Sequence, residues 1–167
     1  MTEWTLDSTP LTPGAFAPFG DVIEASSATN KVMNEARFER FHDLALIDVD
    51  TRNNGHVAIS IAESKVPVTL PYRFDIVERH PLGSQAFIPL GNFSFTIVVA
   101  PAGKEVNVED LAAFSTNGAQ GINYHRGTWH MPLISTAAGE KFLIVDRAPG
   151  IDNCDELVLS TPVVLHA

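Results

Sequence analysis

The sequence is divided into short apolar runs separated by Gly, Pro, Asn and Asp, and amphipathic stretches long enough for a full helix are rare. Short runs with turn signals at intervals of about ten residues are typical of β-sandwiches and β-barrels, whereas a parallel α/β sheet needs a helix between successive strands. We therefore predict an all-β fold. The runs that we interpret as strands are 43–49, 57–62, 72–80, 87–90, 93–99, 141–146 and 156–160.

Two turn signals and one capping signal refine this prediction. Asn54-Gly55 and Gly91-Asn92 suit the positive φ of tight turns, so each predicts a β-hairpin between the two runs that flank it. The segment 108–114 is the one stretch that we interpret as a helix, because Asn107 can act as its N-cap and acidic residues occupy its first turn.

Length and charge limit the possible partners. With 167 residues, 45% of them hydrophobic, the chain can bury one core, so we predict a single domain over residues 1–167. A net charge of −9 disfavours nucleic acid and anionic membrane surfaces, which leaves a small molecule or a protein as the expected partner. Because an anionic substrate would be repelled by this charge, its site would need a local Arg or Lys.

The cell compartment is suggested by two further features. Cys154 is the single cysteine, so no intrachain disulfide can form, and the first residues carry neither a basic region nor an apolar run. We expect a cytoplasmic protein. The acidic neighbours of Cys154 would raise the pKa of its thiol, which argues against a nucleophilic role.

The segment 72–80 alternates with a period of two residues and ends in titratable side chains. Tyr72, Phe74 and Ile76 should face the core, and regular pleating would then point Glu78 and His80 inward as well. A buried carboxylate survives only if it is paired, binds a metal or lines a solvated cavity. The alternative is that Glu78 pairs with Arg79 or another Arg at a barrel rim and that His80 is structural.

A second polar cluster occupies 121–132, where two His, an Arg, a Tyr and a Trp surround a Gly turn. His125 and His130 are separated by an odd number of residues, which would place them on opposite faces of a flat strand. A turn at Gly127 would break this parity. Tyr124 and Trp129 could line a cavity or could be core aromatics with a satisfied polar group.

Both clusters resemble the motifs of the cupin family. Glu78-x-His80, followed by Gln85 and Gly91, is similar to the first cupin motif with two substitutions, and 125–130 is similar to the second. The resemblance implies a double-stranded β-helix, or jelly-roll barrel, with one or two short helices. It also implies a divalent metal held by Glu78, His80, Gln85 and His130, with nickel or zinc as the first candidates.

A resemblance to the ureidoglycolate lyases covers nearly the whole length. It rests on Phe16–Ile23, Asn34 with Arg37-Phe38, Glu78–Leu90 and Tyr124–His130. The chain departs from the family pattern after Asn34, where a Gly-containing turn would be expected. The resemblance implies a cupin-like, usually dimeric enzyme of allantoin breakdown, so a homodimer is expected.

That resemblance implies a reaction in which ureidoglycolate is split into glyoxylate and urea. The hydroxyl proton must be removed while the departing nitrogen is protonated, which a general acid and base can do. The residues that fit this catalysis are Glu78, His80 and His130. A divalent metal could instead lower the pKa of the hydroxyl.

Substrate binding would need a cation and amide groups. Arg126 is the first candidate for the substrate carboxylate, with Arg37 and Arg73 behind it. The other residues that we expect to contact substrate are Asn34, Gln85, Tyr124, His125 and Trp129. Three alternatives stay open: an amidohydrolase that releases ammonia and carbon dioxide, a metal-dependent cupin oxygenase or isomerase, and a small-ligand-binding cupin without catalysis.

Overall fold

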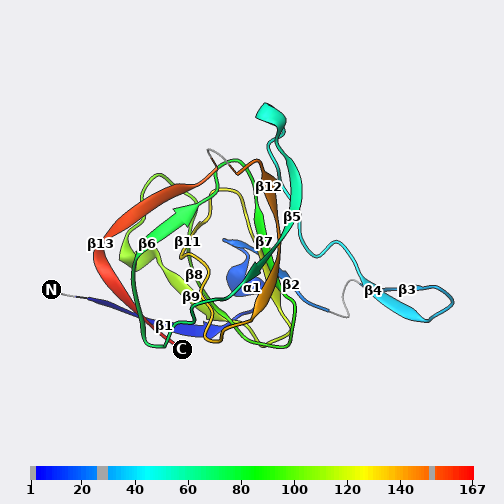
Figure 1. The fold of residues 1–167 in the computed structure, drawn as a ribbon, viewed down its shortest axis with the longest axis horizontal. Helices are drawn as coiled ribbons and strands as arrows, with labels where there is room; N and C mark the ends of the chain where they lie inside the picture. The colour runs from blue at the N-terminus through cyan, green and yellow to red at the C-terminus, as the bar shows by residue number, and fades with distance from the viewer. Residues whose placement is uncertain (1–2, 26–29, 151–152) are drawn as a thin grey trace.

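The fold is almost entirely β, as the sequence predicted (Figure 1). The computed structural model describes residues 3–25, 30–150 and 153–167. Six strands close into a barrel in the order β1 (Trp4–Pro10), β13 (Asp155–His166), β6 (Tyr72–Arg79), β11 (Trp129–His130), β8 (Thr96–Ala100) and β9 (Ala112–Ser115). The described helices are α1 (Pro13–Phe16), η2 (Arg52–Asn54) and η3 (Val108–Asp110). None of the described helices is long and apolar enough to cross a membrane.

A second sheet has five strands and faces the first. Its order is β2 (Gly20–Ile23), β10 (Gly121–Tyr124), β7 (Gln85–Pro89), β12 (Lys141–Ala148) and β5 (His56–Glu63). Strand β5 pairs along its whole length with β12, so its other edge carries no partner within the described chain. This arrangement confirms the predicted barrel.

Two apolar clusters form the core. One contains Val77, Val98 and Trp129, and the other contains Phe87, Val99 and Phe142. Because Val98 and Val99 are neighbours on β8 and belong to different clusters, both faces of this strand are buried.

The predicted hairpin between 43–49 and 57–62 is wrong. No strand forms over 43–49, where a single bridge joins Val49 to Gly83. Positive φ values occur at Asn53 and Asn54, 53° and 62°, whereas Gly55 has a φ of −58°, so the predicted turn conformation is correct at Asn54 and wrong at Gly55. Strand β5 pairs instead with β12 in eight residue pairs, a long antiparallel contact that outweighs the local turn signal.

The predicted hairpin across Gly91-Asn92 is also wrong. Strand β7 pairs with β10 and β12, whereas β8 pairs with β9 and β11. The two runs therefore lie in different sheets, and the connection between them crosses the barrel edge. Burial of Phe93 and Phe95 against Phe142 favours this crossing over a two-residue turn.

The predicted helix over 108–114 is reduced to the single turn of η3. Asn107 and Asp110 form the capping box that the sequence suggested. The chain then becomes β9, which pairs with β8 and with β1. Ladder hydrogen bonds on both sides of this segment override its weak helical preference.

A cavity of about 740 Å³ opens between the two sheets along β6. Tyr72, Phe74 and Ile76 line it together with Arg73 and Asp75, so the lining does not follow the predicted period of two. Ile76 is 40% exposed, whereas Val77 is fully buried in the core, so Ile76 does not join the core as predicted. Its wall also contains Arg73, Lys65 and Glu156, which lie toward the surface.

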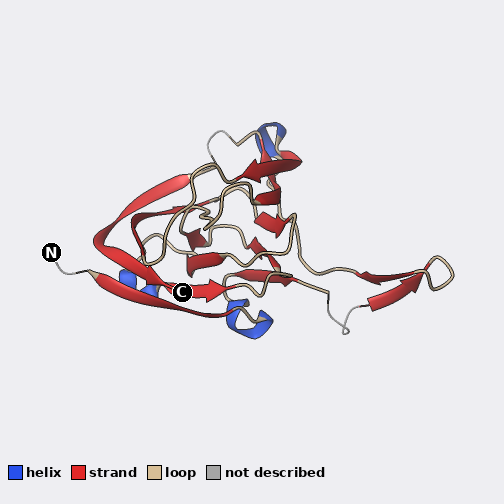
Figure 2. Ribbon diagram, turned by 60° about the horizontal axis from the view of Figure 1, so that its bottom comes forward, coloured by secondary structure: helices blue, strands red, loops and turns tan. Residues whose placement is uncertain are grey.

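Strands β3 (Asn30–Met33) and β4 (Phe38–Phe41) form a two-stranded hairpin that pairs with no other described strand. Figure 2 shows this hairpin projecting well away from the barrel, and we call residues 30–41 the arm.

Candidate active site

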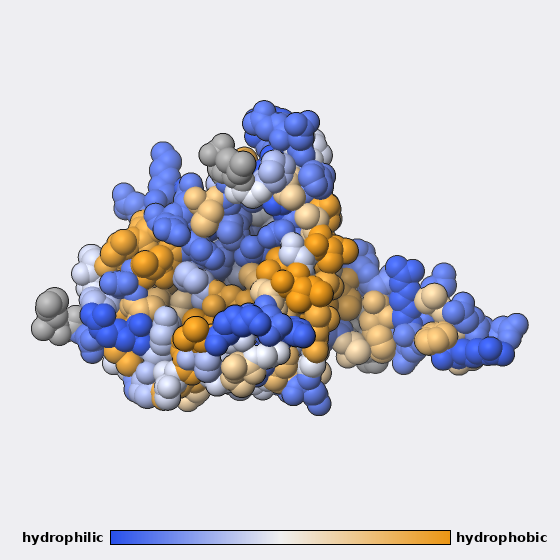
Figure 3. Space-filling model, in the orientation of Figure 1, coloured by the Kyte–Doolittle hydropathy of each residue, from blue (hydrophilic) through white to orange (hydrophobic). Residues whose placement is uncertain are grey.

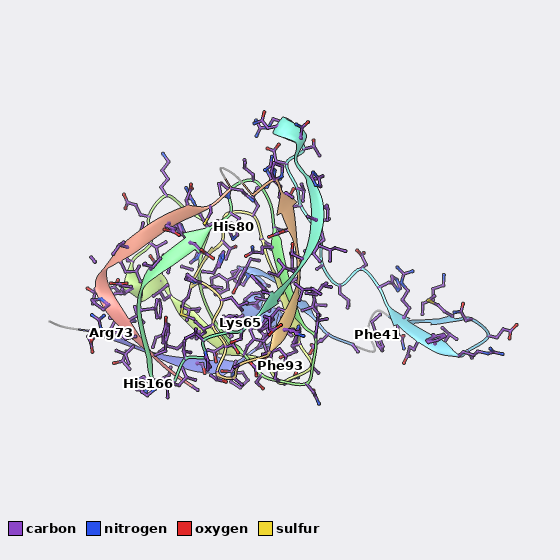
Figure 4. All side chains as sticks on the ribbon, in the orientation of Figure 1. Phe41, Lys65, Arg73, His80, Phe93 and His166 are labelled. Carbon is purple, nitrogen blue, oxygen red and sulfur yellow. The ribbon has the colours of Figure 1, made fainter. Side chains whose placement is uncertain are left out.

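Glu78, His80 and His130 converge at the end of β6. Strand β11 places His130 directly opposite Glu78, and one ligand atom from each of the three residues lies within 4.8 Å of the others. The rings of His80 and His130 are 5.1 Å apart. In Figure 4, His80 lies at the end of the barrel opposite to His166. The inward orientation predicted for Glu78 and His80 thus brings them together with His130.

Backbone carbonyls fix the tautomer of both imidazoles. The Nδ1 of His80 is 2.7 Å from the carbonyl oxygen of Asn153, and the Nδ1 of His130 is 3.0 Å from that of Thr128. Since a carbonyl can only accept, each Nδ1 carries a hydrogen and each Nε2 keeps its lone pair. Both Nε2 atoms are buried and make no hydrogen bond to any residue that the structure describes.

Burial and the carboxylate act in opposite directions on His130. Its side chain is 2% exposed, and this burial lowers the pKa of its imidazole below the ordinary 6.5, although Glu78 acts to raise it. The Glu78 Oε1 is 3.4 Å from His130 Nε2. Interaction with His130 lowers the pKa of Glu78, and burial partly offsets this. At neutral pH the pair therefore consists of a neutral imidazole beside an ionised carboxylate.

Tyr124 and Gln85 extend the cluster. The ring of Tyr124 stacks on that of His130 with a centroid distance of 4.3 Å and an angle of 17°. Gln85 is paired directly with Tyr124 across β7 and β10, so both side chains share one face. The Gln85 Nε2 donates to Asp146 at 3.1 Å, which leaves its buried Oε1 unpartnered.

The donor set fits a divalent cation. Two imidazole nitrogens with free lone pairs and a carboxylate are borderline ligands that suit zinc or nickel. The carbonyls behind His80 and His130 are the outer partners that usually orient such ligands. The unpartnered Oε1 of Gln85 is a further oxygen on the same face.

The turn at Gly127 separates His125 from His130. Gly127 has a φ of 78°, and its N–H donates to the carbonyl of His80, which joins this turn to the end of β6. The exposed His125 turns outward and lies 3.1 Å from Asp21. Arg126 donates to both carboxylate oxygens of Asp48, at 2.8 and 2.6 Å. The predicted anion clamp is thus already occupied by a carboxylate of its own chain.

Trp129 is not brought to the cluster. Its indole donates to the carbonyl of Gly103 at 3.0 Å, and its ring is 3% exposed within the barrel core. The guanidinium of Arg79 lies 4.6 Å above this ring and also pairs with Asp155. Because Trp129 and His130 are adjacent on β11, they face opposite sides, so the alternative of Trp129 as a core aromatic holds. Arg79 likewise is not the partner of Glu78.

Asn34 and Arg37 lie in the turn at the tip of the arm. Arg37 approaches only Glu35, at 3.9 Å, and its side chain is 76% exposed. Arg73 pairs with Glu3 at the surface. Within one chain, these residues are not part of the cluster.

Two supporting residues, Asn153 and Asp146, were missed from the sequence. Asn153 binds His80 through its carbonyl and the N–H of Leu82 through its Oδ1, and Asp146 holds Gln85. Asn153 acts partly through its backbone, so its residue type gave no signal. Cys154 approaches Glu78 at 3.7 Å, and burial together with Glu78 raises the pKa of its thiol to about 11. The direction of this shift is the one that the acidic neighbours of Cys154 predicted.

The family model and the relatives that match this chain carry the same description. Residues 3–166 match the family described as ureidoglycolate lyase. A ureidoglycolate lyase of Pseudomonas fluorescens (strain Pf0-1) is 48% identical over 91% of this chain and 90% of its own. One from Burkholderia mallei (strain NCTC 10229) is 45% identical over 91% and 88%. A 3,4-ketoisomerase from Helicobacter canadensis covers 75% of this chain and 80% of its own, with 14% identity and a TM-score of 0.40, too low to support an argument. The chain belongs to the ureidoglycolate lyase family.

Proposed function

We propose that this enzyme splits ureidoglycolate into glyoxylate and urea, and that the Glu78, His80 and His130 cluster performs the reaction. The observation that carries the proposal is the convergence of two buried, unpartnered imidazole Nε2 atoms with one carboxylate at the end of β6. Membership of the ureidoglycolate lyase family supports the choice of substrate.

The reaction needs one proton to move and one bond to break. The reacting carbon of ureidoglycolate carries a hydroxyl, a carboxylate and a urea nitrogen. Loss of the hydroxyl proton lets the C–O bond become a carbonyl while the C–N bond breaks, and the urea nitrogen takes up a proton. No water and no covalent intermediate are required, so a positioned acid–base group suffices.

His130 is the best placed group for this transfer. Its neutral Nε2 can accept the hydroxyl proton, because burial keeps its pKa low and the Nδ1 hydrogen is held by Thr128. The carboxylate of Glu78 stabilises the imidazolium that forms, and the same nitrogen then returns the proton to the leaving urea. His80 presents a second lone pair that can accept a hydrogen bond from the substrate.

A divalent cation is the second way in which these side chains can act. Glu78, His80 and His130 would hold it, with Gln85 as an additional oxygen ligand. Such an ion polarises a bound hydroxyl and lowers its pKa. We expect the purified protein to bind one zinc or nickel ion per chain in a titration followed by calorimetry. His80→Gln should weaken binding by at least about tenfold, whereas His166→Gln should not. Equal binding by the two variants would contradict this cation site.

Product analysis tests the reaction itself. Incubation with ureidoglycolate should release glyoxylate and urea in equal amounts and no ammonia. Ammonia and carbon dioxide in place of urea would identify an amidohydrolase instead. Binding of ureidoglycolate without conversion would leave only a ligand-binding cupin.

A further inference from the structure

The arm buries too little surface to be stable by itself. Val32 and Phe38 are 62% and 63% exposed, although both belong to strands. The pairs Val32 with Glu39 and Met33 with Phe38 alternate in facing, so each side of the ribbon presents an apolar residue. An isolated two-stranded hairpin is at best marginally stable in water. The arm is therefore built to pack against another surface.

The tip of the arm is held in an unfavourable backbone conformation. Asn34, Glu35 and Ala36 have successive φ values of 51°, 57° and 65°. Asparagine tolerates the left-handed region, but glutamate and alanine cost about 1 kcal/mol or more each there. Strained turns of this kind persist where surrounding contacts or a function fix them. This turn presents Arg37 at the tip.

The proposed active site has no free cation among the described residues around it. Arg126 is engaged by Asp48, and Arg79 by Asp155. The guanidinium of Arg147 donates to three backbone carbonyls. The substrate carboxylate would instead meet Glu78 and Asp146, so a site that binds it lacks a component. Arg37 is exposed and has only a weak partner in Glu35.

Strand β5 offers a surface that the arm could cover. Val57, Ile59 and Ile61 are 51%, 71% and 64% exposed and alternate along this strand, so they form one apolar row. In Figure 3 hydrophobic side chains gather on the side of the barrel where β5 and β12 lie. An extended segment can also add to the free edge of β5 as a further strand.

The register relates the beginning of β5 to the active site, on the face opposite to the row of Val57, Ile59 and Ile61. Ala58 at the beginning of β5 pairs with Asp146, and Asp146 holds Gln85 beside Tyr124. A ribbon that lies along β5 and ends near His56 therefore has its tip at the end of the barrel that carries the cluster. Strands rise about 3.3 Å per residue, so the arm is about 20 Å long and can cover the row from Val57 to Ile61.

Charge favours a second copy of this chain as the partner. The arm carries Lys31, Arg37 and Arg40 against Glu35 and Glu39, whereas the chain as a whole has a net charge of −9. The arm is thus a cationic projection on an acidic protein. Opposite net charges on the arm and on the body of another copy steer the two together.

We propose that two copies exchange arms, and that the arm of one copy lies along β5 of the other and brings Arg37, with Asn34 beside it, to that copy's active site. This inference rests on the proposed function, because it assigns Arg37 to the substrate carboxylate. Each copy presents the same arm and the same β5 row, so a two-fold axis satisfies both contacts.

Mixed dimers test the exchange directly. Arg37→Gln should lower kcat/KM by about 10- to 100-fold, through an increase in KM, because a charge-assisted contact is lost. His130→Asn should be inactive. When the two variants are unfolded and refolded together, half of the dimers are mixed and each has one complete site, so about a quarter of wild-type activity should return. If Arg37 acted within its own chain, no activity would return.

Two controls make this result specific. Arg73→Gln makes the same substitution at an arginine that pairs with Glu3 at the surface, outside the arm and the cluster, and should keep near wild-type kcat/KM. Unfolding and refolding the Arg37→Gln variant alone should not raise its activity. A wild-type protein that does not convert ureidoglycolate would overturn the proposed function. The exchange of arms would then be tested by the sedimentation of the wild type and the variants alone.

Sedimentation measures assembly independently of activity. Wild type should sediment as a dimer at micromolar concentration, whereas Phe38→Glu and Ile59→Glu should sediment as monomers. Val158→Glu is a matched control, because Val158 is 70% exposed on β13, outside the proposed contact. Circular dichroism confirms that the variants are folded. A wild-type monomer, or dimers of Phe38→Glu and Ile59→Glu, would overturn the exchange of arms.

Discussion

Two backbone carbonyls determine which nitrogen of each active-site imidazole is available. Those of Asn153 and Thr128 hold the Nδ1 hydrogens of His80 and His130. A change of side chain at Asn153 or Thr128 would preserve these contacts if the backbone kept its course. The reactive state of the site is therefore set by chain geometry as well as by residue type.

Replacement of His130 tests the residue that carries the reaction. His130→Asn keeps a polar side chain but removes the Nε2 lone pair, so kcat should fall by about 10²- to 10⁴-fold. Steady-state glyoxylate release measures the effect. His166→Asn, at the opposite end of the barrel, serves as the matched control and should keep near wild-type kcat (Figure 4). Full activity of His130→Asn would move the catalytic centre elsewhere.

At this scale, side-chain facing could be predicted for part of the site. The period of two in β6 correctly pointed Glu78 inward, and the turn at Gly127 brought His130 to the same place. The pairing of Arg126 with Asp48 could not be predicted, because the two residues are far apart in the sequence and share no strand. The same holds for Asn153 behind His80.

At the scale of elements, Arg147 connects β12 to the loop before β5. Its side chain is 4% exposed and donates to the carbonyls of Asp50, Arg52 and Pro149 at 2.8 to 2.9 Å. Gly55 packs so closely here that a Cβ would lie 2.6 Å from the Arg147 guanidinium and 2.0 Å from the Asp50 carbonyl oxygen. One guanidinium thus replaces the ladder hydrogen bonds that this loop lacks.

Removal of this guanidinium should destabilise the fold. Arg147→Met would leave three carbonyls without their donor, so the free energy of unfolding should fall by about 2 to 4 kcal/mol. Arg52→Met removes an exposed guanidinium paired with Asp50 and should lower the free energy of unfolding much less than Arg147→Met. Urea unfolding of both variants measures the difference. Equal midpoints would show that Arg147 is not the connecting residue.

Strands were easier to predict than their partners. Apolar runs located β5, β7, β12 and the first part of β13, because local sequence determines where a chain is extended. Pairing depends on contacts between distant segments, so two local turn signals gave wrong hairpins. The helix expected over 108–114 failed for the same reason, because β9 is stabilised by β1 and β8.

At the scale of the whole molecule, the buried site makes stability depend on pH. The folded pKa of His130 lies below the ordinary 6.5, so the unfolded chain binds its proton more readily. The free energy of unfolding should therefore decrease as the pH falls from about 6.5 to the folded pKa of His130. Glu78, whose pKa is lowered from 4.5, adds a further loss below that value.

Thermal unfolding at a series of pH values measures this dependence. His130→Asn removes the titrating imidazole, so its melting temperature should fall less than that of wild type between pH 7 and pH 5. Parallel curves for the two proteins would contradict the burial of a neutral imidazole.

A projecting arm that completes another copy's site ties catalytic competence to encounters between molecules. Below the dissociation constant of the pair, specific activity would decline with dilution, after a delay set by how slowly the arms separate. Concentrating the sample would restore it. A cell that makes little of this protein would then contain mostly inactive single copies. The rate of the reaction in the cell would rise more steeply than the concentration of the protein.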